Sequence, residues 1–429
     1  MAQIKKVSGS STTSAAAAEA AAAAARAAEA ARRAAEARQQ AQAALKQRVT
    51  ATAAKLPNRF TPAATQTRAP APLHYRKLQE LERKGIDGKL IGSAVEDALK
   101  GLQGPFNKQP ETPAQALERR SPAYATMPPE QQAQAEAVYA SSDATGRQRL
   151  VDLMNQDCTT LLIRDTEGET LLQNLSELAL QEMDPALAES GVTRESLLAS
   201  VMTELTPGMV NQDGHGTCTV TSAQYMLVSQ NPSEYVRIME GLLSPSGSAT
   251  LASGVTVDRD DASIAPDSST SRSGSERIFQ AAMMQYAKGG EEGDYDNVED
   301  KLNGLNKDDQ ERMLEALFGA EFDAYDGSFN FNDDREDMRR YVEEHLPGQV
   351  YTSMEWGDGG HAVVIEEIRD GRVYFRNPWG PNDSEPGHVE HDPERRIEDP
   401  ETGLESMTVE EYQSRVTGVF VATEDSPVA

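Results

Sequence analysis

The sequence predicts an α+β protein, because its helix-forming and strand-forming segments lie in separate parts of the chain. Helical segments dominate up to about residue 320. After that point, four segments rich in β-branched and aromatic residues predict strands: "GQVYTSMEW", "HAVVIEEI", "RVYFRN" and "VTGVFVA". This segregation is the signature of the α+β class. A length of 429 residues further predicts two or three units rather than one.

The first part of the chain has a composition unlike a packed core. Residues 1–56 predict a low-complexity, Ala-rich tail, helical or disordered, because 15–48 are almost all strong helix formers. The repeating apolar residue is Ala, which does not support a coiled-coil seam. A solvated tail and an export or docking segment both remain open. Residues 57–128 predict Pro-rich linkers, the second at about 105–128, around a short helical segment.

The remaining chain predicts two further segments. Several helices are expected over 129–205, and a larger domain with helices followed by strands over 206–429. Within it, residues 244–275 are small and polar and predict an exposed loop, with a short strand at "GVTV".

Charge and cysteine content exclude several classes of protein. The net charge is −28, from 41 basic and 69 acidic residues, which argues against nucleic acid or an anionic membrane as partner. No apolar run is long enough to predict a membrane span, and the first residues do not resemble a signal peptide. Two cysteines do not make a disulfide framework, so a cytoplasmic location or a leaderless export route is expected. The oligomeric state stays open.

The stretch "NQDGHGTCTVTSAQYML" contains one of these cysteines, Cys218. Glycines permit a tight turn before it, and the apolar spacing after it predicts a helix with Cys218 in its first turn. The dipole and N–H groups of a helix N-terminus favour the thiolate, so Cys218 is either a nucleophile or a buried structural thiol. The other cysteine, Cys158 in "LMNQDCTTLL", is expected in the core.

A nucleophilic thiol needs a base, a group that orients the base, and oxyanion donors. His361 opens a predicted strand, Asn377 ends the next, and Gln212 precedes Cys218 by six residues. Asp370-Gly371 predicts the hairpin turn between the strands. A regular two-residue turn would place Asn377 on the face opposite His361. A three-residue turn or a β-bulge would bring both to one face.

These motifs together resemble the papain-like cysteine peptidases. The pattern Gln-x5-Cys, then Gly-His, then Asn-Pro-Trp-Gly has the family's order and separations, and the last two pieces are most similar to the calpain branch. The segments "SERIFQAAMMQYAKGG" and "MTVEEYQSRVTGVFV" resemble calpain-like sequences as well, so the resemblance covers roughly 205–425. The chain departs from the family at Thr219, where an aromatic residue is usual, and it lacks the calcium-binding helix-loop-helix module of conventional calpains.

The resemblance implies a papain-like two-lobed fold, with Cys218 on a helical lobe and His361 and Asn377 on an antiparallel β lobe. It implies a cysteine endopeptidase that forms a thioester acyl-enzyme on Cys218. His361 would be the base, Asn377 would orient it, and Gln212 would be an oxyanion donor. Trp379 would shield the His–Asn hydrogen bond. No cofactor or metal is expected, and the partner is a protein or peptide substrate.

Several alternatives are weighed against this interpretation. The same fold could serve an acyl transferase or glutamine deamidase, although these usually orient the histidine with Asp rather than Asn. It could also be a non-catalytic binding module. His215 and Cys218 have metal-ligand spacing but lack two further ligands for zinc. Residues 75–205 could be an inhibitory pro-segment or an accessory domain.

Overall fold

The computed structural model describes seven stretches of the chain, and all of them lie after residue 110: 111–265, 271–289, 304–326, 333–346, 348–357, 359–380 and 395–423. The predictions for the Ala-rich tail, the first linker and the helical segment at 75–104 therefore lie outside the described residues. The described stretches belong to one compact unit, Pro110–Ala429.

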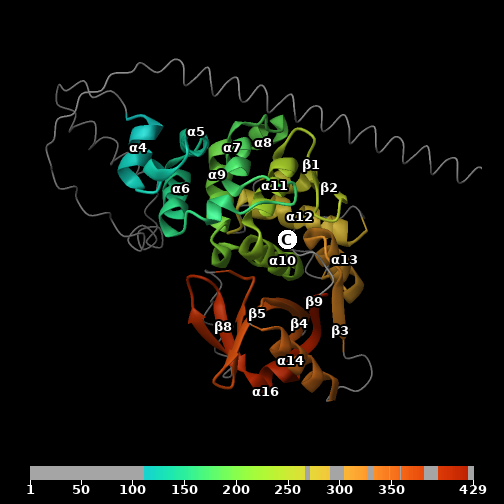
Figure 1. The fold of residues 1–429 in the computed structure, drawn as a ribbon. Helices are drawn as coiled ribbons and strands as arrows, with labels where there is room; N and C mark the ends of the chain where they lie inside the picture. Colours follow the sequence, from blue (N-terminus) through green and yellow to red (C-terminus); the bar gives the residue numbers. More distant parts are fainter. Residues whose placement is uncertain are drawn as a thin grey trace, which may run out of the picture. The chain divides into compact units, whose positions relative to one another are not determined.

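This unit is an α+β structure, as the sequence predicts, with twelve α-helices in its described part (Figure 1). The helices that precede the sheet are α4 (Pro113–Arg120), α5 (Pro129–Ala140), α6 (Ala144–Gln156), α7 (Leu171–Leu180), α8 (Pro185–Glu189), α9 (Arg194–Glu204), α10 (Cys218–Gln230), α11 (Pro232–Leu243), α12 (Gly274–Ala287) and α13 (Lys307–Phe318). Two more, α14 (Asp333–His345) and α16 (Val409–Arg415), lie between strands.

Both described sheets are antiparallel. The larger has seven strands in the order β3-β9-β4-β5-β6-β8-β7, with bounds β3 (Phe322–Asp326), β4 (Val350–Trp356), β5 (Gly359–Arg369), β6 (Arg372–Arg376), β7 (Arg396–Asp399), β8 (Leu404–Thr408) and β9 (Val416–Ala422). All four predicted strands are in it. The smaller sheet pairs β1 (Ser248–Thr250) with β2 (Thr256–Asp258).

The large sheet is covered on both faces. Ala362 and Val364 on β5 belong to the core that the helices form, whereas Val363 and Ile365 belong to a second core with α14 and α16. Burial on both faces explains why β5 reads as a continuous apolar run instead of an alternating one. In Figure 1 the helices from α4 to α13 lie above the sheet and α14 and α16 below it.

Helix α10 lies between the other helices and the sheet, and its sequence fits this position. Every residue from Cys218 to Val228 is buried, so the helix is buried all round rather than amphipathic. It contacts both β5 and α11. Pro232 cannot continue the helix, and Asn231 caps α11 instead, accepting a hydrogen bond from the Glu234 N–H at 3.0 Å.

Part of the second predicted linker, at about 105–128, is helical. Residues 113–120 form α4, whose N-cap Thr112 makes a capping box with Gln115, and Leu117 is fully buried. Pro113 is at the first helical position, where proline is well tolerated, so the prolines here start a helix.

The helices of 129–205 and the domain that begins at 206 share one hydrophobic core. Polar contacts join them too: the Asn174 amide donates to the Ser233 carbonyl at 3.1 Å, and the Tyr235 hydroxyl donates to Glu204. The expected boundary at 205/206 therefore does not separate two folded units.

The described part of the stretch 244–275, residues 244–265 and 271–275, is more ordered than an exposed loop. It contains β1 and β2, the second at the expected "GVTV", and Leu251, Val257 and Ile264 are buried. The short polar residues form turns between these apolar contacts.

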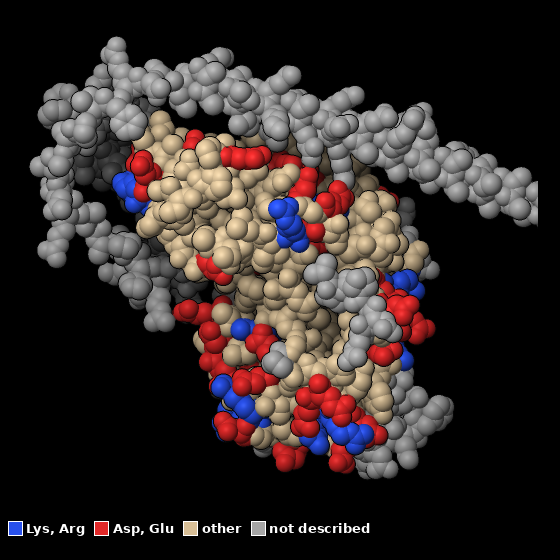
Figure 2. Space-filling model, viewed as in Figure 1, with Lys and Arg blue, Asp and Glu red and all other residues tan. Residues whose placement is uncertain are grey.

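None of the described helices is long and apolar enough to cross a membrane. Figure 2 shows that acidic and basic side chains gather over the lower part of the visible face, where β8, α14 and α16 lie.

Candidate active site

Cys218 is the first residue of α10 and is 8% exposed. Burial raises the pKa of its thiol above the usual value of 9.0. Hydrogen bonds from the backbone N–H groups of Ala362, Thr219 and Cys218 itself act in the opposite direction but do not outweigh burial. The expected thiolate is therefore not the resting form of this buried sulfur. Ala362 directly follows His361, so the sulfur lies beside the strand end that carries the imidazole.

His361 and Asn377 are on one face of the sheet and are hydrogen-bonded, with 3.0 Å between His361 Nε2 and Asn377 Oδ1. The turn between their strands has two residues, Asp370 and Gly371, both with positive φ. A regular hairpin with this turn would separate the two side chains, but the register shifts by one residue between Ile365 and Glu367. The sequence left open a longer turn or a bulge, and the structure has the bulge.

The bulge directs Glu366 towards α10. The Tyr225 hydroxyl on that helix donates to the Glu366 carboxylate, and Arg376 Nε forms an ion pair with it at 3.2 Å. Bulges commonly re-aim a side chain in this way. Packing of the helices on the sheet thus stabilises the register that unites His361 with Asn377.

Two indole rings enclose the imidazole. The ring centroids of Trp356 and Trp379 lie 4.9 and 4.8 Å from that of His361. The pKa of His361 is lowered from 6.5 to about 4, chiefly by burial; the hydrogen bond to Asn377 acts in the opposite direction, and the charge of Arg395 adds a smaller lowering effect. Trp379 was predicted to shield this bond. Trp356 was recognised only as part of a strand.

Asn377 has two partners that the sequence did not predict. Its Nδ2 donates to Glu405 Oε1 at 2.9 Å, and the backbone N–H of Trp379 donates to its Oδ1 at 3.2 Å. Glu405 in turn forms an ion pair with Arg395, with 2.9 Å between Oε2 and Nε, and both side chains are buried. No local motif marks either residue, because each reaches the site only through the pairing of β8 with β6 and of β7 with β8.

Gln212 is buried in the loop before α10, and its Nε2 donates to the carbonyl oxygen of His215 at 2.8 Å. An amide nitrogen carries two hydrogens, so the second can serve an oxyanion. The loop turns at Asp213, which has φ 53°, and Asn211 Oδ1 accepts a hydrogen bond from the Asp213 N–H at 2.7 Å. The left-handed residue is thus an aspartate, a type that tolerates this conformation, and not one of the neighbouring glycines.

Side chains of helix α12 bind both ends of the loop before α10, at Asn211 and at Thr217. Glu276 Oε1 accepts from the Asn211 N–H at 2.8 Å, and Gln280 Nε2 donates to the Asn211 carbonyl at 2.9 Å. Gln280 Oε1 also accepts from the Thr217 hydroxyl at 2.9 Å. The backbone N–H and carbonyl of Asn211 are therefore both fixed by side chains of the segment "SERIFQAAMMQYAKGG". The resemblance of this segment to calpain-like sequences did not predict these contacts.

Other predicted residues have clear positions. Cys158 is exposed, contrary to expectation, because α6 ends at Gln156 and the chain leaves the core there. Thr219 is buried, and its carbonyl accepts from the Tyr351 hydroxyl at 3.2 Å. His215 is buried within the loop. In the described part of the chain, no group of three or more His, Cys, Asp or Glu side chains could hold a metal ion.

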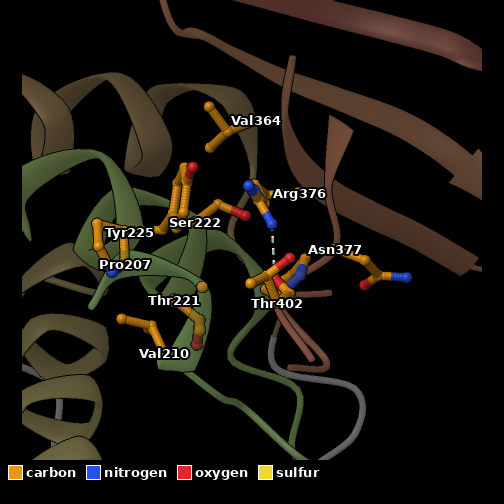
Figure 3. A pocket seen from close by; sticks show the side chains of 11 residues that line it. Pro207, Val210, Thr221, Ser222, Tyr225, Val364, Arg376, Asn377 and Thr402 are labelled. Atoms are coloured by element: carbon orange, nitrogen blue, oxygen red, sulfur yellow. Dashed lines mark hydrogen bonds between the residues drawn. The ribbon is translucent and has the colours of Figure 1, made fainter. Parts of the chain in front are cut away.

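A small pocket lies behind Asn377, between α10 and the sheet, with a volume of about 10 Å³ (Figure 3). Ser222, Tyr225 and Arg376 are among its lining residues, and Arg376 donates to the Thr402 carbonyl at 3.0 Å. This volume suits about one water molecule. Neither Cys218 nor His361 lines it, so it is separate from the reacting groups.

Comparison of the whole chain with models of known protein families and with curated proteins finds no match. The chemistry is therefore argued from geometry. The site combines a thiol at a helix N-terminus, an imidazole with a hydrogen-bonded partner, and a fixed amide in the loop before the thiol, which are the kinds of group that acyl transfer through sulfur requires.

Proposed function

We propose that this chain is a cysteine peptidase that hydrolyses peptide bonds through Cys218, His361 and Asn377, with Gln212 as an oxyanion donor. The proposal includes a papain-like two-lobed fold of the calpain type, with α10 on the helical lobe and β5 and β6 on the sheet lobe. Its main support is the 3.0 Å hydrogen bond between His361 and Asn377, formed where the N–H of Ala362 reaches the Cys218 sulfur.

In the first half of the reaction, the Cys218 proton passes to His361 Nδ1 as the sulfur attacks the substrate carbonyl carbon. The sulfur must first turn from the Ala362 N–H towards the imidazole. The lowered pKa of His361 and the raised pKa of Cys218 both favour uncharged groups at neutral pH, which is the starting state for this proton transfer.

The negative charge that develops on the carbonyl oxygen is stabilised by the Gln212 amide and the backbone N–H of Cys218. As the C–N bond breaks, His361 returns its proton to the leaving amine, and a thioester remains on Cys218. Water then loses a proton to His361 and attacks the thioester, which releases the acid and restores the thiol.

The test compares the wild-type chain with Cys218→Ala on a peptide library, with products and self-cleavage followed by mass. We expect cleavage by the wild type alone. A peptidyl epoxide provides a second readout, because it should alkylate Cys218 much faster than the exposed Cys158. Cys158→Ser is the matched control, since it removes the accessible thiol and should leave cleavage unchanged.

Equal cleavage by wild type and Cys218→Ala would overturn the proposal. So would an epoxide that modifies Cys158 faster than Cys218. Transfer of the acyl group to added amines in preference to water would instead identify an acyl transferase on the same site.

A further inference from the structure

Asn377 has a carboxylate as its second partner. Glu405 Oε1 accepts from Asn377 Nδ2 at 2.9 Å, while His361 Nε2 lies 3.0 Å from Asn377 Oδ1. Glu405 is 6% exposed, and in the fold it lies opposite Phe375 on β6, two residues before Asn377. The four side chains His361, Asn377, Glu405 and Arg395 thus form one buried chain of contacts.

We infer that Glu405 is a positioning residue that selects the imidazole tautomer of His361 by fixing the Asn377 amide, an inference that rests on the proposed function.

The reason is the hydrogen-bonding capacity of each group. An ionised carboxylate only accepts hydrogen bonds, so the NH₂ end of the Asn377 amide must face Glu405. The oxygen end then faces His361, and the ring nitrogen that meets it must be a donor. Nε2 consequently carries the proton, and Nδ1 keeps the lone pair that a thiol proton can join.

Two further contacts support this arrangement. The ion pair with Arg395 favours the carboxylate form of Glu405, because an opposite charge nearby stabilises ionisation. The backbone N–H of Trp379 donates to Asn377 Oδ1, which requires the same amide orientation. Since the latter contact is longer, at 3.2 Å, loss of Glu405 weakens the selection without abolishing it.

Charged and titratable groups near the imidazole are few in the described residues. Arg395 packs on both indole rings, Glu405 contacts Asn377, and Cys218 lies across the interface on α10. Arg415 lies over the Trp356 indole. Glu405 is the one acidic group among them that contacts the amide partner of His361.

The test measures the tautomer directly, by nitrogen-15 NMR of the full chain labelled at histidine, with the His361 signals assigned from His361→Gln. We expect the Nε2–H tautomer alone in the wild type at pH 7. In Glu405→Gln a neutral amide can donate or accept, so the Nδ1–H tautomer should become measurable. The turnover number kcat should fall about 10-fold with KM unchanged, because part of the population then has no lone pair on Nδ1 to take the thiol proton, while substrate binding is untouched.

The matched control is Glu234→Gln. It also takes a carboxylate away from a buried arginine, Arg237, but on α11 away from the site. We expect it to leave both the His361 tautomer and kcat unchanged. If Glu405→Gln does not fold, the double variant Arg395→Met/Glu405→Gln carries the same test, because it leaves no unpaired buried charge.

A folded Glu405 variant with only the Nε2–H tautomer would overturn the inference, whatever its kcat. The tautomer is read without substrate. A wild-type chain that cleaves no peptide would therefore refute the proposed function and still leave the role of Glu405 to be decided by NMR.

Discussion

The backbone N–H of Gln212 donates to the carbonyl oxygen of Pro378 at 2.8 Å. This bond joins the loop before α10 to the Asn-Pro-Trp loop after β6. Gln212, the proposed oxyanion donor, is thus tied through the backbone to the loop that begins at Asn377. A contact of this kind between two loops is sensitive to any atom inserted between them.

Gly380→Ala tests this contact. A Cβ at Gly380 would lie 2.8 Å from the Asn211 Cβ, and the residue has φ +77°. We expect the substitution to cost about 1–2 kcal/mol of unfolding free energy for the left-handed conformation and roughly 1–3 kcal/mol more for the clash. Peptide cleavage should fall at least about 10-fold, because displacements near 1 Å disturb catalysis strongly.

Gly357→Ala is the control for strain alone. Gly357 has φ +58°, but a Cβ there would meet nothing within 4 Å. It should show the conformational cost and keep full activity. Equal losses of activity in both variants would mean that the contact with Asn211 has no part in the reaction. Urea unfolding and initial rates provide the two readouts.

The hairpin that carries His361 and Asn377 shows how far the sequence can be interpreted. Asp370-Gly371 correctly predicts the hairpin turn, but the need for both side chains on one face left a three-residue turn and a bulge open, and the structure has a two-residue turn with a bulge. The bulge itself has no sequence signature. It is determined by contacts of Glu366 with Tyr225 and Arg376, which come from other elements and become neighbours only on folding.

The strands that were not predicted have a similar physical explanation. β3, β7 and β8 are short and carry several charged or polar residues, so they lack the β-branched pattern of β9. Glu405 lies on β8, and Arg395 directly precedes β7. Because these strands were not predicted, neither were the contacts of the two residues at the site. The sequence motifs singled out Cys218, His361 and Asn377 as candidates, together with Gln212 and Trp379, but not Glu405 or Arg395.

Gln212→Ala tests the oxyanion donor. The amide is lost while the Gln212 backbone contact to Pro378 can persist, so the loop keeps one of its anchors. We expect kcat to fall about 10²–10³-fold with little change in KM, because the donor acts on charge that develops in the transition state. Steady-state kinetics on one defined peptide separate the two constants.

Gln310→Ala provides the comparison for this variant. Gln310 is also buried, and its Nε2 donates to the Leu305 carbonyl at 2.9 Å, on a helix that carries none of the proposed reacting groups. Its loss should lower stability and leave kcat unchanged. If both variants lost the same activity, the effect of Gln212 would be structural and its role as oxyanion donor would be refuted.

A buried pair of acids predicts a pH effect on stability. Burial raises the pKa of Glu204 from 4.5 to about 7 and that of Glu276 well above its usual value, with hydrogen bonds from Ser273 acting against it in both. Between pH 4.5 and about 7, Glu204 holds a proton in the folded state and has released it in the unfolded chain. The stabilisation from Glu204 is therefore complete below pH 4.5 and is lost as pH rises through about 7.

Glu204→Gln removes this titration. As pH rises from 4.5 to 7, the difference in unfolding free energy between variant and wild type should move in favour of the variant, by an amount on the order of a few kcal/mol. His361, with its pKa lowered to about 4, contributes stability that rises with pH over this range, but it does so in both proteins and cancels in the difference. Urea unfolding of both proteins at several pH values measures the difference in unfolding free energy. A difference that does not change with pH would exclude a raised pKa at Glu204.

Truncation tests whether residues before 206 inhibit the site or complete its core. Helix α7 buries four leucines, Leu171, Leu172, Leu175 and Leu178, in the core shared with α11. At about 1.5–3 kcal/mol each, their loss alone would equal the whole stability of a typical domain. A chain starting at Thr206 should therefore not fold, whereas one starting at Pro110 should unfold cooperatively and retain activity. Circular dichroism during thermal unfolding and peptide cleavage follow both. A folded 206–429 chain more active than the full chain would restore the pro-segment interpretation.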